Sequence, residues 1–458
     1  MTHTIPSRFA HASRAVVRAC AAVAVLVATS VGGANAAEVL FRSNPASLPD
    51  TVTSFHGSVP PAPPLTQPTQ PPGTPDVPVT PAELARAADS LAGLRKASRG
   101  VDYLWVLRDQ LIEPAAIDSL VDRASRMGVR GLLVQVVGRG DAYYRSQLLP
   151  RAEPLGKSSD DDPLAHVLAR AHAAGLEVHA WVNCMLVWSG ARRPRDPDHV
   201  VNAHPEWLAE LPGGLAISRL SPKAMQRLNV EGIYLAPAHP GVRRWVASVA
   251  AEIASHYDVD GIHLDYIRQP DLETGYDPNT RARFALAQGV DPERMDELPA
   301  PQRSEVLATW RQFQRDQVTA VVQAVRDTLR AVRPAVVLSA AVVADTSRSE
   351  GSTAQSWRSW VRERRVDRVF LMCYSPDVQH VMDQLLVFDG ELGASERVVP
   401  GIAVYNTSPS TAALKLRGAR AMGYPLLAVY SYDSLFNMDR GWTRLEASLA
   451  DSPGDEGP

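Results

Sequence analysis

The chain alternates between short apolar segments of strand length and longer segments whose apolar residues recur with helical spacing. Eight segments have the length and composition of buried strands: Val101–Leu107, Gly131–Val137, Leu176–Asn183, Gly261–Ile267, Val336–Val343, Val369–Tyr374, Val398–Val404 and Leu426–Tyr432. Amphipathic segments of helical period follow them: Pro114–Met127, Pro163–Ala174, Val242–His256, Pro301–Val332, Ala354–Glu363, Val378–Phe388, Ser410–Met422 and Trp442–Leu449. Eight strands that are each followed by a helix are typical of a (β/α)8 TIM barrel.

An open, doubly wound parallel sheet would show the same alternation. Its dinucleotide-binding members carry G-x-G-x-x-G after the first strand, and no such motif follows Val101–Leu107. The pattern therefore favours the α/β barrel. The surplus length falls after strands 3 and 4, at 184–239 and 268–300. Both are strand-to-helix connections, and these open on the face of a barrel that holds the active site. We expect them to form extended loops beside a substrate cleft.

Residues 1–36 have the pattern of a secretory signal peptide. Three arginines precede an apolar stretch at 19–33, and Ala34-Asn35-Ala36 supplies the small residues of a cleavage site. A short membrane anchor is the alternative, but the stretch is shorter than the ~20 residues that a transmembrane helix needs. We expect cleavage after Ala36, no membrane span in the mature chain, and a periplasmic or secreted protein.

Proline dominates the segment that follows. Residues 37–98 include Val59-Pro-Pro-Ala-Pro-Pro64, and such a run favours an extended polyproline II tether and lead-in. An arm wrapped on the folded domain is the alternative. The barrel is expected at 99–450, and the polar residues 451–458 are expected to form a flexible tail.

Composition and charge exclude several classes of protein. The chain is 45% hydrophobic and 21% charged, which excludes a disordered protein, and its three cysteines exclude a disulfide framework. The formal charge is −3, and the basic residues form no stripe or block, so nucleic acid is not an expected partner. The first strand lacks H-x-H, and H-E-x-x-H and C-x-x-C do not occur. We therefore expect no metal and no cofactor.

Strand 4 places a carboxylate at the predicted active-site face. With a period of two, Gly261, His263 and Asp265 share one face, while the apolar Ile262 and Leu264 share the other. The apolar face should lie under the helices, so His263 and Asp265 should point into the barrel. A carboxylate there is costly to desolvate unless it is paired or takes part in catalysis. Asp265 is therefore the first catalytic candidate, with a structurally paired aspartate as the alternative.

Strand 3 repeats this arrangement with His179, Trp181 and Asn183 on one face. An aromatic ring among polar side chains suits a carbohydrate, because rings stack on sugar faces and amides bind hydroxyls. Buried residues that satisfy one another would give the same pattern. Other candidate substrate-binding residues lie at the ends of strands 2, 6, 7 and 8 or just after them: Gln135, Arg139, Asp141, Tyr143, Tyr374, Tyr405, Tyr432 and Asp433.

Three later carboxylates are predicted to reach the same rim as Asp265. Asp345, Asp377 and Asp433 each follow a strand and precede a helix. Glycoside hydrolysis requires two carboxyl groups across a cleft, one as acid and one as base or nucleophile. Each of the three could equally be a helix N-cap. The second carboxylate of the predicted pair therefore stays open, with Asp345 and Asp377 as its candidates.

Several motifs together resemble the bacterial glycosyl-hydrolase-like family 10, over most of residues 99–435. They are Gln135, Gly140-Asp-Ala-Tyr-Tyr-Arg-Ser146, Asp162-Pro-Leu164, Ala171-His-Ala-Ala-Gly175, Leu176-Glu-Val-His-Ala-Trp-Val-Asn183 and Val259-Asp-Gly-Ile-His-Leu-Asp265. The resemblance implies a barrel fold and glycosidase activity in the cell envelope. One position departs from the family pattern, because Tyr266 stands where a second Asp usually follows the strand-4 Asp.

A looser likeness to α-amylase-type barrels would make Asp265 the nucleophile and Asp345 the acid, while galactosidase-like barrels would favour Asp377. The chitinase-like D-x-D-x-E pattern is absent, since Ile267 occupies the Glu position. We expect an exported glycoside hydrolase of an envelope or extracellular polysaccharide, with peptidoglycan glycan strands as the first candidate substrate. A non-catalytic glycan-binding barrel and an envelope scaffold protein are the alternatives.

Overall fold

The computed structural model describes residues 100–156, 161–270, 273–388, 392–393 and 395–450. The predicted signal peptide, tether and C-terminal tail lie outside these residues. Within them, parallel strands close into a barrel in the order β1-β12-β11-β10-β9-β8-β3-β2, which confirms the predicted (β/α)8 TIM barrel. The barrel strands are β1 (Tyr103–Val106), β2 (Gly131–Val137), β3 (Glu177–Asn183), β8 (Gly261–Asp265), β9 (Val337–Val343), β10 (Arg368–Cys373), β11 (Val398–Ala403) and β12 (Ala428–Tyr430).

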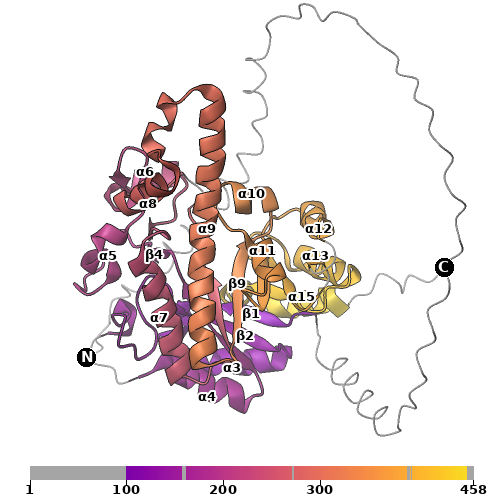
Figure 1. The fold of residues 1–458 in the computed structure, drawn as a ribbon. Coiled ribbons are helices and arrows are strands. Elements are labelled where there is room, and N and C mark those ends of the chain that lie inside the picture. The colour runs from indigo at the N-terminus through magenta and orange to yellow at the C-terminus, as the bar shows by residue number, and fades with distance from the viewer. Residues whose placement is uncertain (1–99, 157–160, 271–272, 389–391, 394, 451–458) are drawn as a thin grey trace, which may run out of the picture. The chain divides into compact units, whose positions relative to one another are not determined.

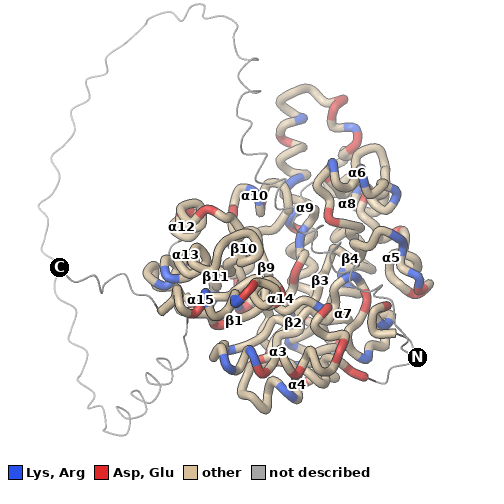
Figure 2. Tube along the Cα trace, turned by 180° about the vertical axis from the view of Figure 1, so that it is seen from behind, with Lys and Arg blue, Asp and Glu red and all other residues tan. Residues whose placement is uncertain are grey.

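Helices pack around the outside of the barrel (Figure 1). They are α3 (Pro114–Met127), α4 (Pro163–Ala173), α7 (Pro240–His256), α9 (Ala300–Val332), α11 (Trp357–Arg362), α12 (Val378–Leu386), α13 (Pro409–Ala421) and α15 (Gly441–Ala450). Several begin at a proline, whose fixed φ suits the first helical position. Asp162 also caps α4, since its Oδ1 accepts the Ala165 backbone N–H at 3.1 Å. Basic and acidic residues are interspersed over these helices (Figure 2).

The element boundaries agree closely with the hydrophobic pattern, with two instructive differences. The predicted strand 261–267 ends at Asp265, because Tyr266 adopts a positive φ of 47° and leaves the sheet. The predicted helix 354–363 is the shorter α11, preceded by a separate helix, α10 (Thr346–Gly351). Among the described helices, none is long and apolar enough to cross a membrane.

Large side chains fill the interior of the barrel. The inner cluster consists of Tyr103, Trp105, Leu133, Trp181, Phe370, Val399, Leu426 and Ala428. Trp181 thus faces inward, as the alternation along strand 3 predicts. Two glycines make room for these side chains. A Cβ on Gly401 would lie 2.5 Å from the Trp105 ring, and one on Gly261 would lie 2.1 Å from Nδ1 of His179.

The loops after strands 3 and 4 are long, as predicted, and each carries secondary structure. The loop after β3 contains β4 (Leu186–Trp188), α5 (Val200–Ala203), β5 (Glu210–Leu211), β6 (Leu215–Ala216), α6 (Pro222–Arg227) and β7 (Ile233–Tyr234). The loop after β8 contains α8 (Pro278–Gln288) and leads into α9. Short 3-10 turns lie at η2 (Arg108–Leu111), η3 (Glu153–Leu155), η4 (Pro205–Trp207), η5 (Ile217–Arg219) and η6 (Pro292–Glu297).

Helix α9 takes part in two separate hydrophobic cores. Its C-terminal half contributes Val318, Val322 and Leu329 to the main core between the barrel and its helices. Its N-terminal half contributes Trp310 to a small satellite core with Phe284 of α8 and other residues of the same loop. In Figure 1 the N-terminal half of α9 lies beside α6 and α8, beyond the ends of the strands.

Candidate functional site

Asp265 is the last residue of β8, at the C-terminal end of the barrel, and it pairs in register with Asn183 of β3. It is only 8% exposed. Its Oδ1 accepts the Tyr266 backbone N–H at 2.6 Å. Burial raises the pKa of Asp265 to about 6, although this N–H, the Arg268 guanidinium and the Trp181 indole oppose the rise. The carboxyl can therefore hold a proton in mildly acidic solution, as a general acid must.

A charged cluster lies beside Asp265. Arg268 is 7% exposed, and its Nη2 donates to Oε1 of Glu231 at 2.9 Å. The other carboxylate oxygen of Glu231 accepts the Tyr234 hydroxyl at 2.8 Å. Burial would raise the pKa of Glu231, but Arg268 and Tyr234 outweigh it, so the pKa is lowered. Because its negative charge contributes to the raised pKa of Asp265, the two carboxyl groups belong to one electrostatic unit.

Backbone hydrogen bonds bring the loop after β3 to the end of β8. The Cys184 N–H donates to the Asp265 carbonyl at 2.8 Å, and the Met185 N–H donates to the Tyr266 carbonyl at 3.1 Å. The Leu235 N–H in turn donates to Met185 at 2.9 Å, and β7 pairs with β4 in antiparallel fashion. This pairing places Glu231, which precedes β7, against the side chain of Arg268.

Tyr266 occupies a backbone conformation that is unusual for its residue type. Its φ of 47° lies in the left-handed region, which Asp tolerates much better than Tyr. The ring is held by two neighbours, since the Arg268 guanidinium carbon lies 4.8 Å from its centre and the Tyr234 ring lies 6.2 Å away. The aromatic side chain therefore has defined partners at the position where the family pattern has a second Asp.

Aromatic rings form a continuous path from the barrel interior to its mouth. The Tyr430 ring lies 6.5 Å from that of Trp181 and stacks on Tyr374 at 5.1 Å. Tyr405, which is 41% exposed, meets the Tyr430 ring edge-on at 6.0 Å. Burial raises the pKa of Tyr374, and the charge of Asp265 adds to this effect. Tyr374 and Asp265 thus share one environment, and rings of this kind can stack on sugars.

The side-chain amides of Gln135 in β2 and Asn183 in β3 form hydrogen bonds with other groups of the protein. Asn183 accepts the Trp181 indole N–H at 2.9 Å and donates to the Gly138 carbonyl at 2.7 Å. Gln135 accepts from Nη1 of Arg108 at 2.9 Å and donates to Asn183 at 3.4 Å. This network links the ends of β2 and β3 and orients the Trp181 ring below the mouth.

The sequence pattern places His179 and His263 on the inner faces of their strands but does not specify their depth. The structure places both below the barrel mouth. Nε2 of His263 accepts the Trp105 indole N–H at 3.0 Å, and its Nδ1 lies 2.9 Å from Oγ of Ser339. Burial lowers the pKa of His263 well below 6.5, so the ring is neutral and holds Trp105. The centre of the His179 ring lies 5.6 Å from that of Tyr103, and Nε2 of His179 lies 3.4 Å from Oε2 of Glu177. His179 therefore occupies the layer below His263.

The loop after β2 holds four buried polar atoms that lack a hydrogen-bond partner among the described residues. They are Oδ2 of Asp141, the hydroxyl of Tyr143, Nε of Arg139 and Nη2 of Arg151. The other Asp141 oxygen accepts the Arg139 backbone N–H at 3.1 Å, and the Arg139 guanidinium carbon lies 4.9 Å from the centre of the Trp188 ring. Burial and the Asp141 charge raise the pKa of Tyr143. Unpaired polar groups of this kind can bind the hydroxyls of a ligand.

Asp345 and Asp377 are exposed residues at the N-termini of helices. Asp345 caps α10, since its Oδ1 accepts the Arg348 backbone N–H at 3.0 Å. Asp377 caps α12 in the same way, with the His380 backbone N–H at 2.7 Å. The structure thus gives both carboxylates the capping role that the sequence had left open beside the catalytic one.

Asp433 and Tyr432 lie in α14 (Tyr432–Asn437), where both make contacts within the fold. Asp433 accepts the Leu107 backbone N–H at 3.0 Å and the Gln110 side-chain amide at 2.9 Å. The Tyr432 hydroxyl accepts from Arg123 of α3 at 3.2 Å. Asp433 therefore ties the start of α14 to the loop after β1, while Tyr432 packs among the outer helices.

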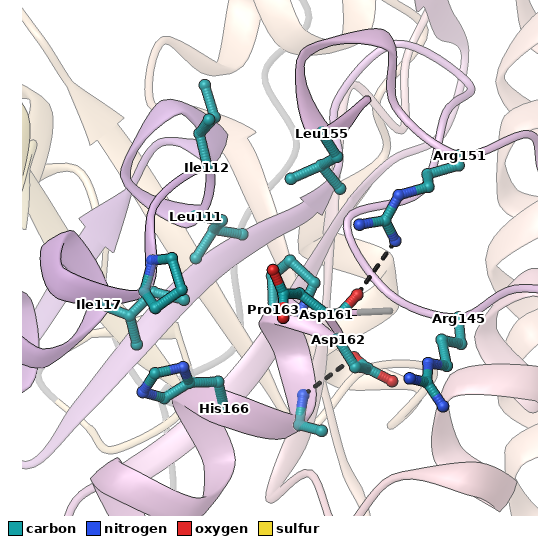
Figure 3. Close-up of a pocket in the computed structure, with 12 residues that line it drawn as sticks. Leu111, Ile112, Ile117, Arg145, Arg151, Leu155, Asp161, Asp162, Pro163 and His166 are labelled. Carbon is teal, nitrogen blue, oxygen red and sulfur yellow. Dashed lines mark hydrogen bonds between the residues drawn. The ribbon is translucent and has the colours of Figure 1, made fainter. Parts of the chain in front are cut away.

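A cavity of about 440 Å³ lies away from these residues, between the start of α3 and the loop before α4 (Figure 3). Leu111 and Ile117 line one side, and Leu155 and Arg151 line the other. Nη1 of Arg151 donates to the Asp161 carbonyl at 3.1 Å. The cavity shares no residue with the mouth of the barrel. Within the described ranges, no group of three or more His, Cys, Asp or Glu side chains could hold a metal ion.

The sequence pattern indicated Asp265, Tyr374 and Tyr405, which lie at the barrel mouth, and Trp181, which lies below it in the interior. It did not identify Glu231, Arg268, Tyr234 or Tyr430. Arg268 lies three residues after Asp265 and could have been selected for that spacing. Glu231 carries no comparable signal, because it lies in a long loop without a regular hydrophobic period.

Comparisons with known proteins agree with this architecture. A family model described as Glycosyl hydrolase-like 10 matches residues 99–400. Glycosyl hydrolase YngK of Bacillus subtilis is 26% identical over 221 residues, which cover 47% of this chain and 37% of that protein. Glycosyl hydrolase DigH of Escherichia coli is 31% identical over 166 residues, which cover 34% of this chain and 35% of that protein. The matches thus span little more than a third of these relatives.

Two solved structures share the fold. The glycoside hydrolase domain of PgaB (BpsB) from Bordetella bronchiseptica has a TM-score of 0.56 at 14% identity, over 77% of this chain and 99% of that one. α-L-Fucosidase isoenzyme 2 from Paenibacillus thiaminolyticus has a TM-score of 0.51 at 14% identity, over 77% of this chain and 47% of that one. At this level of identity the likeness establishes the barrel alone.

Proposed function

Because the chain belongs to the glycosyl hydrolase-like 10 family, we propose that it is an exported glycoside hydrolase of an envelope or extracellular polysaccharide, with Asp265 in its catalytic machinery. One observation carries the proposal, namely a buried carboxyl at the C-terminal end of a barrel strand beside a path of aromatic rings. Barrel enzymes place their chemistry at this end. The glycoside hydrolases among its relatives and structural neighbours support a hydrolase that acts on glycans.

Asp265 is suited to donate a proton to the leaving group. Burial raises its pKa to about 6 from an ordinary value of 3.8, so its carboxyl stays protonated in mildly acidic solution. The proton passes to the glycosidic oxygen as the bond to the anomeric carbon breaks. Water then supplies the hydroxyl group of the anomeric carbon. An alternative role as nucleophile requires the ionised carboxylate, and the two roles have opposite pH dependences.

The aromatic rings and the loop after β2 are the proposed binding elements. Tyr374 and Tyr405 offer ring faces or edges at the mouth, above the buried Trp181 ring, and sugar rings stack on such surfaces. Asp141 and Tyr143 offer buried polar groups to sugar hydroxyls. The long loops after strands 3 and 4 favour a polymeric substrate over a small sugar. Peptidoglycan glycan strands are the first polymer to test, because they are abundant in the envelope.

Asp345 and Asp377, which the sequence predicts as candidates for the second carboxylate, both cap helices. Either one would have to exchange its helix-capping hydrogen bond for a contact with substrate. A non-catalytic glycan-binding barrel is the second candidate function, and Tyr266 favours it by replacing the second Asp of the family pattern. That candidate predicts glycan binding without turnover.

The test incubates the purified protein with peptidoglycan glycan strands, an α-glucan and a β-galactoside. Shorter oligosaccharides in any reaction support the glycosidase, and the reactive polymer identifies the substrate. Binding without cleavage of every polymer would establish the binding module instead. N-terminal sequencing of the exported protein checks processing, with Ala37 expected as the first residue and an intact Met1 contradicting cleavage.

A further inference from the structure

We propose that Glu231 is the second catalytic carboxylate of the barrel mouth and acts together with Asp265 as base or nucleophile. This inference rests on the proposed glycosidase function. It assigns a role to a loop residue that the motifs along the strands do not include.

The contacts of Glu231 hold its carboxylate in one orientation while leaving it accessible. Oε1 accepts from Arg268 at 2.9 Å and Oε2 accepts from Tyr234 at 2.8 Å. These hydrogen bonds use one direction at each oxygen, and each oxygen has a second lone pair. The side chain is 34% exposed, whereas that of Arg268 is 8% exposed. The Glu231 carboxylate therefore keeps solvent-accessible surface, whereas the Arg268 cation that holds it is buried.

The same arginine acts on both carboxyl groups. Arg268 lowers the pKa of Glu231 through the ion pair, and it also lowers the pKa of Asp265 from a greater separation. The charge of Glu231 and burial act in the opposite direction on Asp265. One carboxyl of the pair is thus favoured in its charged form and the other in its protonated form. Such a division is the usual arrangement of acid and base in glycosidases.

The reaction balances with these two groups and one water. Asp265 gives its proton to the glycosidic oxygen as the bond to the anomeric carbon breaks. Glu231 either bonds to the anomeric carbon or takes a proton from the attacking water. In the first case water later releases the sugar and returns a proton to Asp265. In the second case the proton on Glu231 is lost to solvent, while Asp265 regains one.

A purely structural ion pair between the loop and β8 would show the same contacts, so the test must separate the two roles. Glu231→Gln removes the charge but keeps the size of the side chain. Glu273→Gln is a matched control, because Glu273 accepts the Tyr276 hydroxyl at 2.7 Å with the same spacing of three residues. The Glu273 carboxylate also lies in a loop beyond the strands, and its hydrogen bond comes from a tyrosine and not from an arginine.

The measurements are turnover and glycan affinity at constant pH, with the melting temperature as a check on folding. We expect Glu231→Gln to lower kcat by ~10²–10⁴-fold while Kd changes by only a few-fold. Sodium azide should restore turnover to Glu231→Ala, as a small nucleophile in the vacated space. Glu273→Gln should keep near-normal kcat. A Glu231→Gln protein with near-normal kcat, or one that loses turnover only by losing the fold or glycan binding, overturns the inference.

Failure of the proposed function would look different. If the wild-type protein cleaves no glycan, both the function and the role of Glu231 are wrong. If it does cleave and Glu231→Gln is equally active, only the role of Glu231 is wrong. An independent readout is the Asp265 carboxyl signal in a nuclear magnetic resonance titration. Glu231→Gln should lower its pKa, and an unchanged value would contradict the coupling between the two groups.

Discussion

Each end of the barrel contains a carboxyl group that is half-buried or buried, but the two groups differ in their hydrogen-bond and ion-pair partners. At the N-terminal end, Glu177 accepts from the Tyr103 hydroxyl at 2.9 Å and from Arg130 at 2.8 Å. Burial alone would raise the pKa of Glu177, yet His179 and Arg130 lower it to about 2. At the C-terminal end, burial prevails and raises the pKa of Asp265 to about 6.

The difference separates a carboxylate that stabilises the fold from one available for chemistry. Glu177 has partners for both oxygens, so its charge is compensated wherever the protein is folded. Asp265 accepts a hydrogen bond from the backbone N–H of the next residue in the chain and has no ion-pair partner among the described residues. A barrel can therefore be stabilised at one end and keep a poorly compensated carboxyl at the other, as barrel enzymes generally do.

The largest expected effect is on turnover. Asp265→Asn preserves the shape of the side chain and removes its proton, so kcat should fall by ~10²–10⁴-fold or more against the polymer that the wild-type protein cleaves. Glu177→Gln is the control at the opposite end and should retain turnover. Rate assays on both folded proteins decide the matter. Near-normal turnover by Asp265→Asn would place Asp265 among structural residues and remove the contrast.

The same two substitutions should have opposite effects on stability at pH 7. The folded-state pKa of Asp265 is raised above its unfolded value, so the ionised form costs stability above pH 6 and the cost vanishes below about 3.8. The pKa of Glu177 is lowered, so its contribution is present above about pH 4.5 and is lost towards pH 2.

Asp265→Asn should therefore leave stability unchanged or increase it, by at most about 3 kcal/mol. Glu177→Gln should decrease it by about 1–3 kcal/mol, because Arg130 and Tyr103 lose a charged partner. Urea unfolding at pH 7 measures both changes. A marked loss of stability in Asp265→Asn would mean that this carboxylate is well compensated after all.

The pH profile sharpens the role of Asp265. If its carboxyl donates the proton, kcat/KM should fall about tenfold for each pH unit above about 6. The unfolding free energy should change little in that range, because most of the stability cost of ionising Asp265 accrues between about pH 3.8 and pH 6 and Glu177 titrates lower still. An activity that instead rises with pH through 6 would identify Asp265 as the nucleophile or base. Initial rates between pH 4 and pH 9 distinguish these outcomes.

The smallest expected effect concerns the exposed rim. Tyr405→Ala removes one ring face, worth about 0.5–1.5 kcal/mol in aromatic contacts, so KM should rise by roughly 2–10-fold with kcat nearly constant. Tyr103→Phe, at the other end, should leave KM unchanged. Steady-state kinetics on the polymer check both variants. A fall in kcat alone for Tyr405→Ala would place that ring in the chemistry rather than in binding.

The sequence predicts the barrel and the direction of Asp265 because both follow from a period of two along buried strands. The same period cannot specify depth, and for this reason His179 and His263 look alike in sequence although they occupy different layers of the interior. The alternation places each on the inner face of its strand. Only the register between neighbouring strands fixes the layer.

The rim carboxylates show a different limit. Asp345 and Asp377 follow strands and precede helices, which is the position of both an active-site acid and an N-cap. The sequence does not indicate Glu231 as a site residue, because its contact with Arg268 depends on the pairing of the very short strands β4 and β7. Elements of two or three residues carry almost no pattern of their own, so the contacts that they create are accessible only in three dimensions.

The uninterrupted length of α9 has a mechanical consequence for the barrel mouth. A continuous helix has no hinge, and this one is anchored at its C-terminal half by Val318 and Leu329 and at its N-terminal half by Trp310. Bending between the two anchors would break several backbone hydrogen bonds at once. The satellite core is therefore held at a fixed distance from the main core by one stiff helix.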